Sequence, residues 1–333
     1  MSFSRNVRNL RLGNSAKGWR KCPSRSLSAT PKLYSGPAPP PKVFTIKSMM
    51  NKKAKKKKIT MVTAYDTPSA IHVDKALIDI LLVGDSVGMV ELGYETTLPV
   101  TMEDIIHHCQ AVTRGCKRPL IVADMPFGSF EACEKDAVRN AARILKEGGG
   151  VDAVKIEGGA VRAGTIKRVV ESGVAVMGHI GLTPQSFSAL GGFRAQGRST
   201  KEALKLVEDA LALEKAGCFG MVIECVPAVV AKAITEAVSI PTIGIGAGPY
   251  TDGQVLVYHD MLGMMQHHHH AQFTPSFCKQ YATVGYAIQN GLADYKHDVE
   301  NELFPTKDFS PYKISKQDED EFIKEFNNLY SAK

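Results

Sequence analysis

From Ile59 onward the chain repeats short, nearly continuous apolar runs, and this rhythm limits its possible folds more than any other feature. Parallel strands that are covered on both faces have this pattern, whereas half-exposed strands alternate apolar and polar residues. We therefore predict eight parallel strands. They lie at residues 59–65, 80–85, 120–124, 153–158, 174–179, 220–225, 241–246 and 255–260.

The segments between these strands have the periodicity of amphipathic helices, most clearly at 101–115 and 201–217. The second segment ends at Gly217, a residue that readily adopts the left-handed conformation found at helix C-termini. Its predicted apolar stripe consists of Leu204, Val207, Leu211 and Ala212. Eight strands joined by helical crossovers predict a closed α/β fold, the (β/α)8 or TIM barrel, over residues 59–293.

A glycine-rich segment at 244–248, GIGAG, matches a dinucleotide-binding loop only in part. Pro249 stands where the third glycine of that pattern belongs, and the segment comes late in the chain. We interpret it as the exit loop of the seventh strand, placed to contact an anionic ligand.

The basic residues are concentrated at the N-terminus. Of the 41 Lys and Arg residues, 16 precede Ile59, and the first acidic residue is Asp66. From Ile59 onward the chain has 25 basic and 34 acidic residues, so this part is mildly acidic, which argues against a nucleic-acid-binding surface there.

Two further features concern membranes and cysteines. No run approaches the roughly 18 consecutive apolar residues of a membrane helix. Seven cysteines without a CxxC pair indicate reduced thiols.

Residues 1–47 are rich in Arg and Ser and lack acids, as in a mitochondrial transit peptide, so we expect import to the mitochondrial matrix. We expect disorder to continue to about residue 58.

The lysine run at 52–58 fits a solvated charge block, and a nuclear or nucleic-acid-binding role is the alternative. We interpret His267–His270 as a solvated loop, and residues 294–333 as a charged, helical tail.

Five polar side chains stand at the ends of consecutive predicted strands. A single strand-end carboxylate usually caps the next turn. Closure of a barrel, however, brings all strand C-termini to one rim, so five such residues converge on one pocket. They are Asp85, Asp124, Glu157, His179 and Glu224.

Several carboxylates in one pocket repel one another unless a cation neutralises them. Asp and Glu oxygens with a single nearby His favour Mg²⁺ over Zn²⁺. Lys155 and Glu157 are two residues apart on one strand and therefore point to the same face. A lysine in this apolar strand needs an anion, which is either Glu157 itself or an anionic substrate beside the metal.

The strand-end motifs, in this order, resemble those of the ketopantoate hydroxymethyltransferase family. The resemblance spans Ile59 to about Gly291, the length of one whole barrel. The matching stretches are MVTAYDTPSA, LLVGDSVGMVELGYETTLPVT, ADMPFGSF, VKIEGG, GHIGLTPQS, GGFRAQGR, ECVP and IGIGAG.

The resemblance implies roles for individual residues. In VGDS, Asp85 would be a metal ligand and would contact the keto acid together with Ser86. In ADMPF, Asp124 would be a second metal ligand near the substrate. In VKIEGG, Lys155 would bind the substrate, and Glu157 would complete the metal shell. Glu224 of ECVP would be the catalytic base, and His179 of GHIGLTPQ would lie in the pocket and help to bind the substrate.

The resemblance also implies a reaction. It is the transfer of a hydroxymethyl group from 5,10-methylenetetrahydrofolate to 3-methyl-2-oxobutanoate, giving 2-dehydropantoate through an enolate that Mg²⁺ stabilises. The family forms large homo-oligomers. The alternative enzyme is a Mg²⁺-dependent carbon–carbon lyase or mutase of the isocitrate lyase and phosphoenolpyruvate mutase type. The alternative outside catalysis is salt-dependent nucleic-acid binding through residues 52–58.

Overall fold

The computed structural model describes residues 42–192, 194–265 and 275–330. Eight parallel strands close into a barrel in chain order, with β8 paired to β1, so the predicted TIM barrel is confirmed. The strands are β1 (Ile59–Thr63), β2 (Ile80–Val83), β3 (Leu120–Asp124), β4 (Ala153–Glu157), β5 (Val176–Gly181), β6 (Gly220–Glu224), β7 (Thr242–Ile245) and β8 (Gly253–Leu256).

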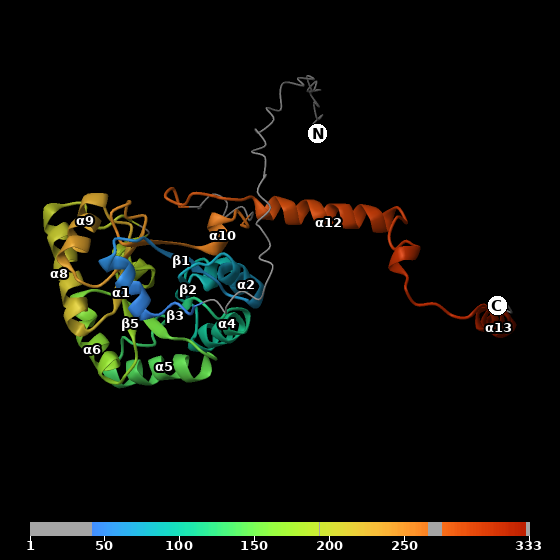
Figure 1. Ribbon diagram of the computed structural model, residues 1–333, viewed down its shortest axis with the longest axis horizontal. Helices are drawn as coiled ribbons and strands as arrows, with labels where there is room; N and C mark the ends of the chain where they lie inside the picture. Colours follow the sequence, from blue (N-terminus) through green and yellow to red (C-terminus); the bar gives the residue numbers. More distant parts are fainter. Residues whose placement is uncertain (1–41, 193, 266–274, 331–333) are drawn as a thin grey trace, which may run out of the picture. The chain divides into compact units, whose positions relative to one another are not determined.

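An outer layer of helices packs on the barrel, each against its neighbour in chain order (Figure 1). The long helices are α2 (Thr67–Lys75), α4 (Met102–Gly115), α5 (Glu134–Glu147), α6 (Ala163–Glu171), α8 (Thr200–Ala216) and α9 (Ala228–Ala237). Shorter elements in the connections are α3 (Val87–Val90), η1 (Ala160–Arg162), η2 (Pro184–Ser186), α7 (Phe187–Leu190) and α10 (Tyr258–Met261).

Helix α8 begins and ends as its sequence predicts. Ser199 and Glu202 form a reciprocal capping box, and Gly217 has φ 99° at the C-terminus. The predicted apolar stripe, however, is wrong, because Leu204 and Leu211 are largely exposed. The buried stripe is Leu206, Ala210, Leu213 and Ala216. The helix is apolar on more than one side, so periodicity alone did not identify the side that faces the barrel.

The end of the barrel differs from the prediction in two ways. Strand β8 ends at Leu256, and residues 258–260, which were predicted to be its last part, instead belong to α10. The connecting segment 246–252, described in full, contains no helix between β7 and β8, because Gly246 and Gly248 have positive φ and Pro249 follows them. The last three residues of GIGAG, 246–248, therefore lie in the exit loop of β7, as expected, whereas Gly244 and Ile245 belong to the strand itself.

Alternate residues of each strand point into the barrel and fill its lower part with apolar side chains. In β4 the inward positions are Ala153, Lys155 and Glu157. The interior lining of this strand is therefore apolar at its N-terminal end and polar at its C-terminal end. Outward positions pack beneath the helices in a second, larger apolar cluster. The inward apolar residues include Ile59, Met61, Ile80, Leu82, Leu120, Val122, Met177, Val222, Ile243 and Val255.

Residues expected to be disordered form helix α1 (Ile46–Ala54), which covers the N-terminal end of the barrel (Figure 1). Phe44 and Met49 are buried in the same cluster as the inward strand residues. The amide of Phe44 donates to the carbonyl of Arg118, just before β3. The expectation of disorder to about residue 58 is therefore wrong for the described part, and the rest of the predicted transit peptide lies outside the described residues.

The first two lysines of the run at 52–58 are likewise not free charges, whereas residues 55–58 are exposed. The Nζ of Lys52 lies 2.6 Å from Asp79 Oδ2, and that of Lys53 lies 2.9 Å from Asp252 Oδ2. Both aspartates also accept from strand backbone, since the amides at positions 60 and 242 donate to them. Lys52 and Lys53 thus tie α1 to the N-terminal ends of the strands.

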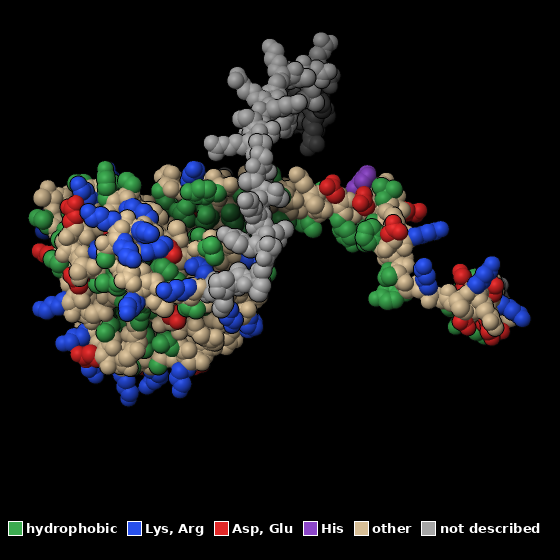
Figure 2. Space-filling view, viewed as in Figure 1, with side chains coloured by type: hydrophobic (Ala, Val, Ile, Leu, Met, Phe, Trp, Pro, Cys, Tyr) green, Lys and Arg blue, Asp and Glu red, His purple; other side chains and the backbone are tan. Residues whose placement is uncertain are grey.

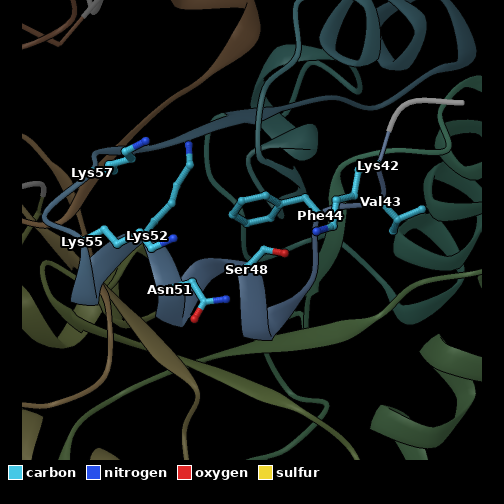
Figure 3. A pocket seen from close by; sticks show the side chains of 8 residues that line it. All are labelled: Lys42, Val43, Phe44, Ser48, Asn51, Lys52, Lys55 and Lys57. Carbon is cyan, nitrogen blue, oxygen red and sulfur yellow. The ribbon is translucent and has the colours of Figure 1, made fainter. Parts of the chain in front are cut away.

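Lys and Arg side chains gather over α1 (Figure 2), and a pocket lies beside this helix (Figure 3). The pocket is lined by Lys42, Val43, Phe44, Ser48, Asn51, Lys52, Lys55 and Lys57. It lies at the end of the barrel opposite to the strand C-termini, where the predicted site residues are.

We expect Lys53→Met to lower the free energy of unfolding by about 3 kcal/mol, because it leaves the mostly buried carboxylate of Asp252 without its cation. Urea unfolding followed by circular dichroism measures this. Lys57→Met, at an exposed position in the same run, should change stability by less than about 0.5 kcal/mol. Equal effects of the two substitutions would contradict the structural role of Lys53.

Beyond the barrel the chain forms α12 (Val284–Glu300), η3 (Lys307–Phe309) and α13 (Lys316–Tyr330). The predicted helical character of the tail agrees with these elements, but its boundary at 294 falls inside α12. Backbone bonds from Tyr281 to Met261 and from Val284 to Leu262 fix the start of this segment. None of the described helices is long and apolar enough to cross a membrane. The four consecutive histidines lie outside the described residues.

Candidate active site

The predicted site residues all lie at the C-terminal end of the barrel. Asp124, Glu157 and Glu224 are the last residues of β3, β4 and β6, His179 lies within β5, and Asp85 follows β2 by two residues. Five of the side chains are almost completely buried, at 5% exposure or less. These are Asp85, Asp124, Lys155, Glu157 and His179.

Asp85 and Glu157 are connected through one glutamine. Gln185 Nε2 lies 2.9 Å from Asp85 Oδ2, and the Gln185 amide lies 3.0 Å from Glu157 Oε2. The amide of Asp85 in turn donates to Asp124 Oδ2 at 3.0 Å. Three carboxylates from three strands are thereby held within one hydrogen-bonded group.

Two cations lie among these carboxylates. Lys155 Nζ is 2.9 Å from Asp124 Oδ1 and 3.2 Å from His179 Nδ1. Burial alone would lower the pKa of Lys155, but Asp124, Glu157 and Asp85 together raise it above its ordinary value. The ammonium therefore remains charged in the closed interior.

His179 lies between two glutamates. Its Nδ1 is 3.3 Å from Glu157 Oε1 and its Nε2 is 3.1 Å from Glu224 Oε2, although neither pair has hydrogen-bond geometry. Burial and the Lys155 charge lower the pKa of His179, but the two glutamates outweigh them and raise it to about 9. The ring is therefore protonated at neutral pH, and its positive charge faces Glu157 and Glu224.

Glu224 differs from the other carboxylates in its exposure. Its side chain is 16% exposed, whereas those of Glu157 and His179 are 4% and 3% exposed. Glu224 is thus the carboxylate at the open side of the cluster, where a molecule entering from solvent meets it first. Gly181 makes this placement possible, since a Cβ there would lie 2.2 Å from the carbonyl oxygen of Glu224.

The charges of the cluster do not balance. Four carboxylates face two cations, which leaves two negative charges when all six groups are ionised. Burial, together with the nearby Asp124 and Glu157, raises the pKa of Asp85 well above its ordinary value. Carboxylates crowded and buried in this way favour the binding of a cation.

The residues fit a hard divalent cation. The donors are carboxylate oxygens, and Asp124 Oδ1 is buried beside the Lys155 ammonium without hydrogen-bond geometry. Within the described ranges no three Asp, Glu, His or Cys side chains converge closely enough to hold a metal ion unaided. That arrangement suits Mg²⁺, which usually takes one or two carboxylates and fills its remaining positions with water and substrate oxygens.

Ser86 lies beside this cluster, with its Oγ 2.8 Å from the hydroxyl of Tyr65. Tyr65 follows β1 and is fully buried, and burial raises the pKa of its hydroxyl above the ordinary value. The tyrosine is therefore neutral and fixes the orientation of the Ser86 hydroxyl. The Nδ1 of His108 lies 2.7 Å from the carbonyl oxygen of Tyr65.

Sequence reasoning missed Gln185 and Tyr65 as members of the site. Both lie within stretches that carry the family resemblance, MVTAYDTPSA and GHIGLTPQS. Tyr65 follows β1 by two residues, the same position that Asp85 has after β2, but it carries no charge that would make its burial conspicuous. Gln185 lies four residues beyond the end of β5, away from the strand-end position, and is also uncharged.

The fold and the site define a class of protein, a TIM-barrel enzyme with an acidic site at the C-terminal ends of its strands. A family model for ketopantoate hydroxymethyltransferase matches residues 43–307. A similar protein of Arabidopsis thaliana, called 3-methyl-2-oxobutanoate hydroxymethyltransferase 1, mitochondrial, is 54% identical over 300 residues, 89% of this chain and 86% of its own length. The Heliobacterium modesticaldum protein of the same activity is 52% identical over 81% of this chain and 95% of its own.

The chain belongs to the ketopantoate hydroxymethyltransferase family and is an enzyme of pantothenate synthesis, a 3-methyl-2-oxobutanoate hydroxymethyltransferase. Among solved structures, phosphonopyruvate hydrolase in complex with oxalate and Mg²⁺ matches with a TM-score of 0.51 at 12% identity. The match covers 86% of this chain and 99% of the hydrolase, and it shows a shared barrel fold.

Proposed function

We propose that the enzyme takes its hydroxymethyl group from 5,10-methylenetetrahydrofolate, and that a Mg²⁺-stabilised enolate of 3-methyl-2-oxobutanoate accepts it to give 2-dehydropantoate. The observation that carries this proposal is the buried acidic cluster, in which four carboxylates face two cations and which would hold two uncompensated negative charges if all six groups were ionised. A chelated divalent cation and an anionic keto acid would together complete its charge balance.

Asp85 and Asp124 would hold the metal, with Glu157 contributing through a water molecule. When bound there, Mg²⁺ would supply positive charge next to the keto oxygen, which lowers the barrier to enolate formation by several kcal/mol. Asp124 has a buried oxygen that no hydrogen bond satisfies, and burial together with the neighbouring carboxylates raises the pKa of Asp85. Both features support this choice of ligands.

Glu224 would remove the proton from C3 of the keto acid. Its carboxylate lies at the open side of the cluster, and the protonated ring of His179 faces its Oε2 from behind at 3.1 Å. General-base catalysis of this kind contributes about 10²–10⁴ in rate. Proton removal generates the carbon nucleophile that attacks the one-carbon unit of the folate.

Lys155 and Ser86 would bind the substrate. The Lys155 ammonium stays charged among the carboxylates and is the cation nearest to Asp124, so it would offset the negative charge of the keto acid. The Ser86 hydroxyl, oriented by Tyr65, would donate to a substrate oxygen. His179 would act through Glu224 and Glu157 rather than through direct proton transfer from the substrate.

We further propose that the enzyme works in the mitochondrial matrix as a homo-oligomer. Relatives from Arabidopsis thaliana and Oryza sativa carry the word mitochondrial in their names, and the first residues of this chain are basic and free of acids. Fusion of residues 1–47 to a fluorescent protein tests the import. A cytosolic signal from the fusion would contradict it.

The reaction is tested by incubating the full-length protein with 3-methyl-2-oxobutanoate and 5,10-methylenetetrahydrofolate and following 2-dehydropantoate by mass spectrometry. We expect product only when both the folate and Mg²⁺ are present, and none after treatment with a chelator. Product formed without the folate would exclude the proposed donor. Cleavage of a keto acid without one-carbon transfer would favour a lyase reaction instead.

A further inference from the structure

Gln185 is an uncharged residue that hydrogen-bonds to two carboxylates of the acidic cluster. It lies in η2, the turn that follows β5, and is 5% exposed. Its Nε2 donates to Asp85 Oδ2 and to the carbonyl of Met125, each at 2.9 Å, while its backbone amide donates to Glu157 Oε2 at 3.0 Å. One residue thus touches the C-terminal ends of β2, β3 and β4.

The chemistry of an amide fits this position and that of other side chains does not. The two partners of Nε2 are a carboxylate and a carbonyl, which only accept, and the NH₂ group has two hydrogens, one for each. The opposite orientation of the amide would place an oxygen against two oxygens. A lysine here would add a charge and a glutamate would add a further repulsion, whereas glutamine satisfies both acceptors without changing the charge of the cluster.

The turn that carries Gln185 is itself fixed. Pro184 begins η2, and the Ser186 amide donates to the Thr183 carbonyl at 2.8 Å. The amide of Leu182 donates to the carbonyl of Glu224 at 2.8 Å. The same short segment therefore connects the backbone of the proposed base to the carboxylates on the opposite side of the site.

We propose that Gln185 is a positioning residue that fixes the carboxylates of Asp85 and Glu157 in the orientation needed to bind a divalent cation. Without these bonds, like charges on Asp85, Asp124 and Glu157 would turn the side chains away from one another. The buried Oε1 of Gln185, which has no partner among the described residues, is available to accept a hydrogen bond from a water molecule in the site. The inference rests on the metal-dependent reaction proposed above.

Gln185→Met tests the inference, because methionine has a similar volume, lacks both side-chain donors and keeps the backbone bond to Glu157. Binding of Mg²⁺ to the metal-free, full-length protein is measured by isothermal titration calorimetry. We expect the Kd to rise by about 10–100-fold, as is typical when a partner of a metal ligand is removed. The control is Gln110→Met, at an exposed glutamine on α4 whose Nε2 also donates to a backbone carbonyl.

Steady-state kinetics supply a second measurement. If Gln185 acts by fixing the metal ligands, the loss of kcat/KM in Gln185→Met is largely restored at saturating Mg²⁺, whereas a general packing defect is not restored by metal. A Kd within twofold of wild type, or activity that Mg²⁺ does not restore, overturns the inference while leaving the proposed function intact. Absence of divalent-cation binding to the wild-type protein overturns both, and so distinguishes the two failures.

Discussion

Glu224→Gln is expected to lower kcat by about 10²–10⁴-fold, the contribution of a well-placed general base. Glutamine keeps the shape of the side chain and an oxygen for contact with the protonated ring of His179, but it cannot take a proton from carbon. Since the carboxylate is only at the edge of the cluster, the fold and the Kd for Mg²⁺ should remain unchanged. Turnover of 3-methyl-2-oxobutanoate in a folate-coupled assay measures the effect.

A more direct measurement separates proton removal from the later steps. The wild-type enzyme should exchange the C3 proton of 3-methyl-2-oxobutanoate with deuterium from solvent, and Glu224→Gln should lose this exchange in parallel with turnover. Glu236→Gln, at an exposed glutamate on α9, is the matched control and should behave as wild type. Near-normal exchange in Glu224→Gln with unchanged folding would show that another group is the base.

Asp85→Asn is expected to abolish Mg²⁺-dependent turnover, with a loss of at least about 100-fold in metal affinity, because it removes a proposed ligand rather than the partner of a ligand. The amide oxygen of asparagine still accepts from Gln185, so the local packing is retained. Calorimetric titration with Mg²⁺ and the product assay provide the two measurements.

The same substitution should have the opposite effect on the stability of the metal-free protein. Asp85 is buried beside Asp124 and Glu157, and this burial and repulsion disfavour its ionised form in the folded state. The asparagine of the Asp85→Asn variant carries no charge and avoids that cost, so thermal unfolding at pH 8 without metal should occur at a higher temperature than in wild type. A lower unfolding temperature would mean that Asp85 has a structural role that outweighs its repulsion.

Asp85→Asn is thus expected to weaken metal binding and to stabilise the metal-free protein. The same opposition between metal binding and stability applies to the whole cluster of carboxylates. Crowding of buried carboxylates is unfavourable for the ligand-free protein and becomes favourable only when a cation binds among them. Metal-free enzyme should therefore gain stability on adding Mg²⁺, as expected for any ligand that binds the folded state preferentially. The carboxylates of the site therefore lower the stability of the metal-free protein in order to bind the metal, whereas the apolar interior of the barrel only stabilises the fold.

The sequence by itself determined the barrel and the strand-end residues. Its apolar runs reflect strands buried on both faces, and the period of two places Lys155 and Glu157 on the same inward side. Closure of the barrel then requires that Asp85, Asp124 and Glu224 share one end. The apolar runs and the period of two both involve residues that are close together in the chain, so they can be recognised from the sequence alone.

Tertiary structure alone decided three other features. Lys52 and Lys53 look like part of a solvated run until Asp79 and Asp252, far along the chain, are brought to them. The buried side of α8 depends on which of its apolar faces meets the strands. Gln185 gains its role only where three strand ends meet around it. In each case the deciding partners are distant in sequence, and their contacts leave no periodic signal in the chain.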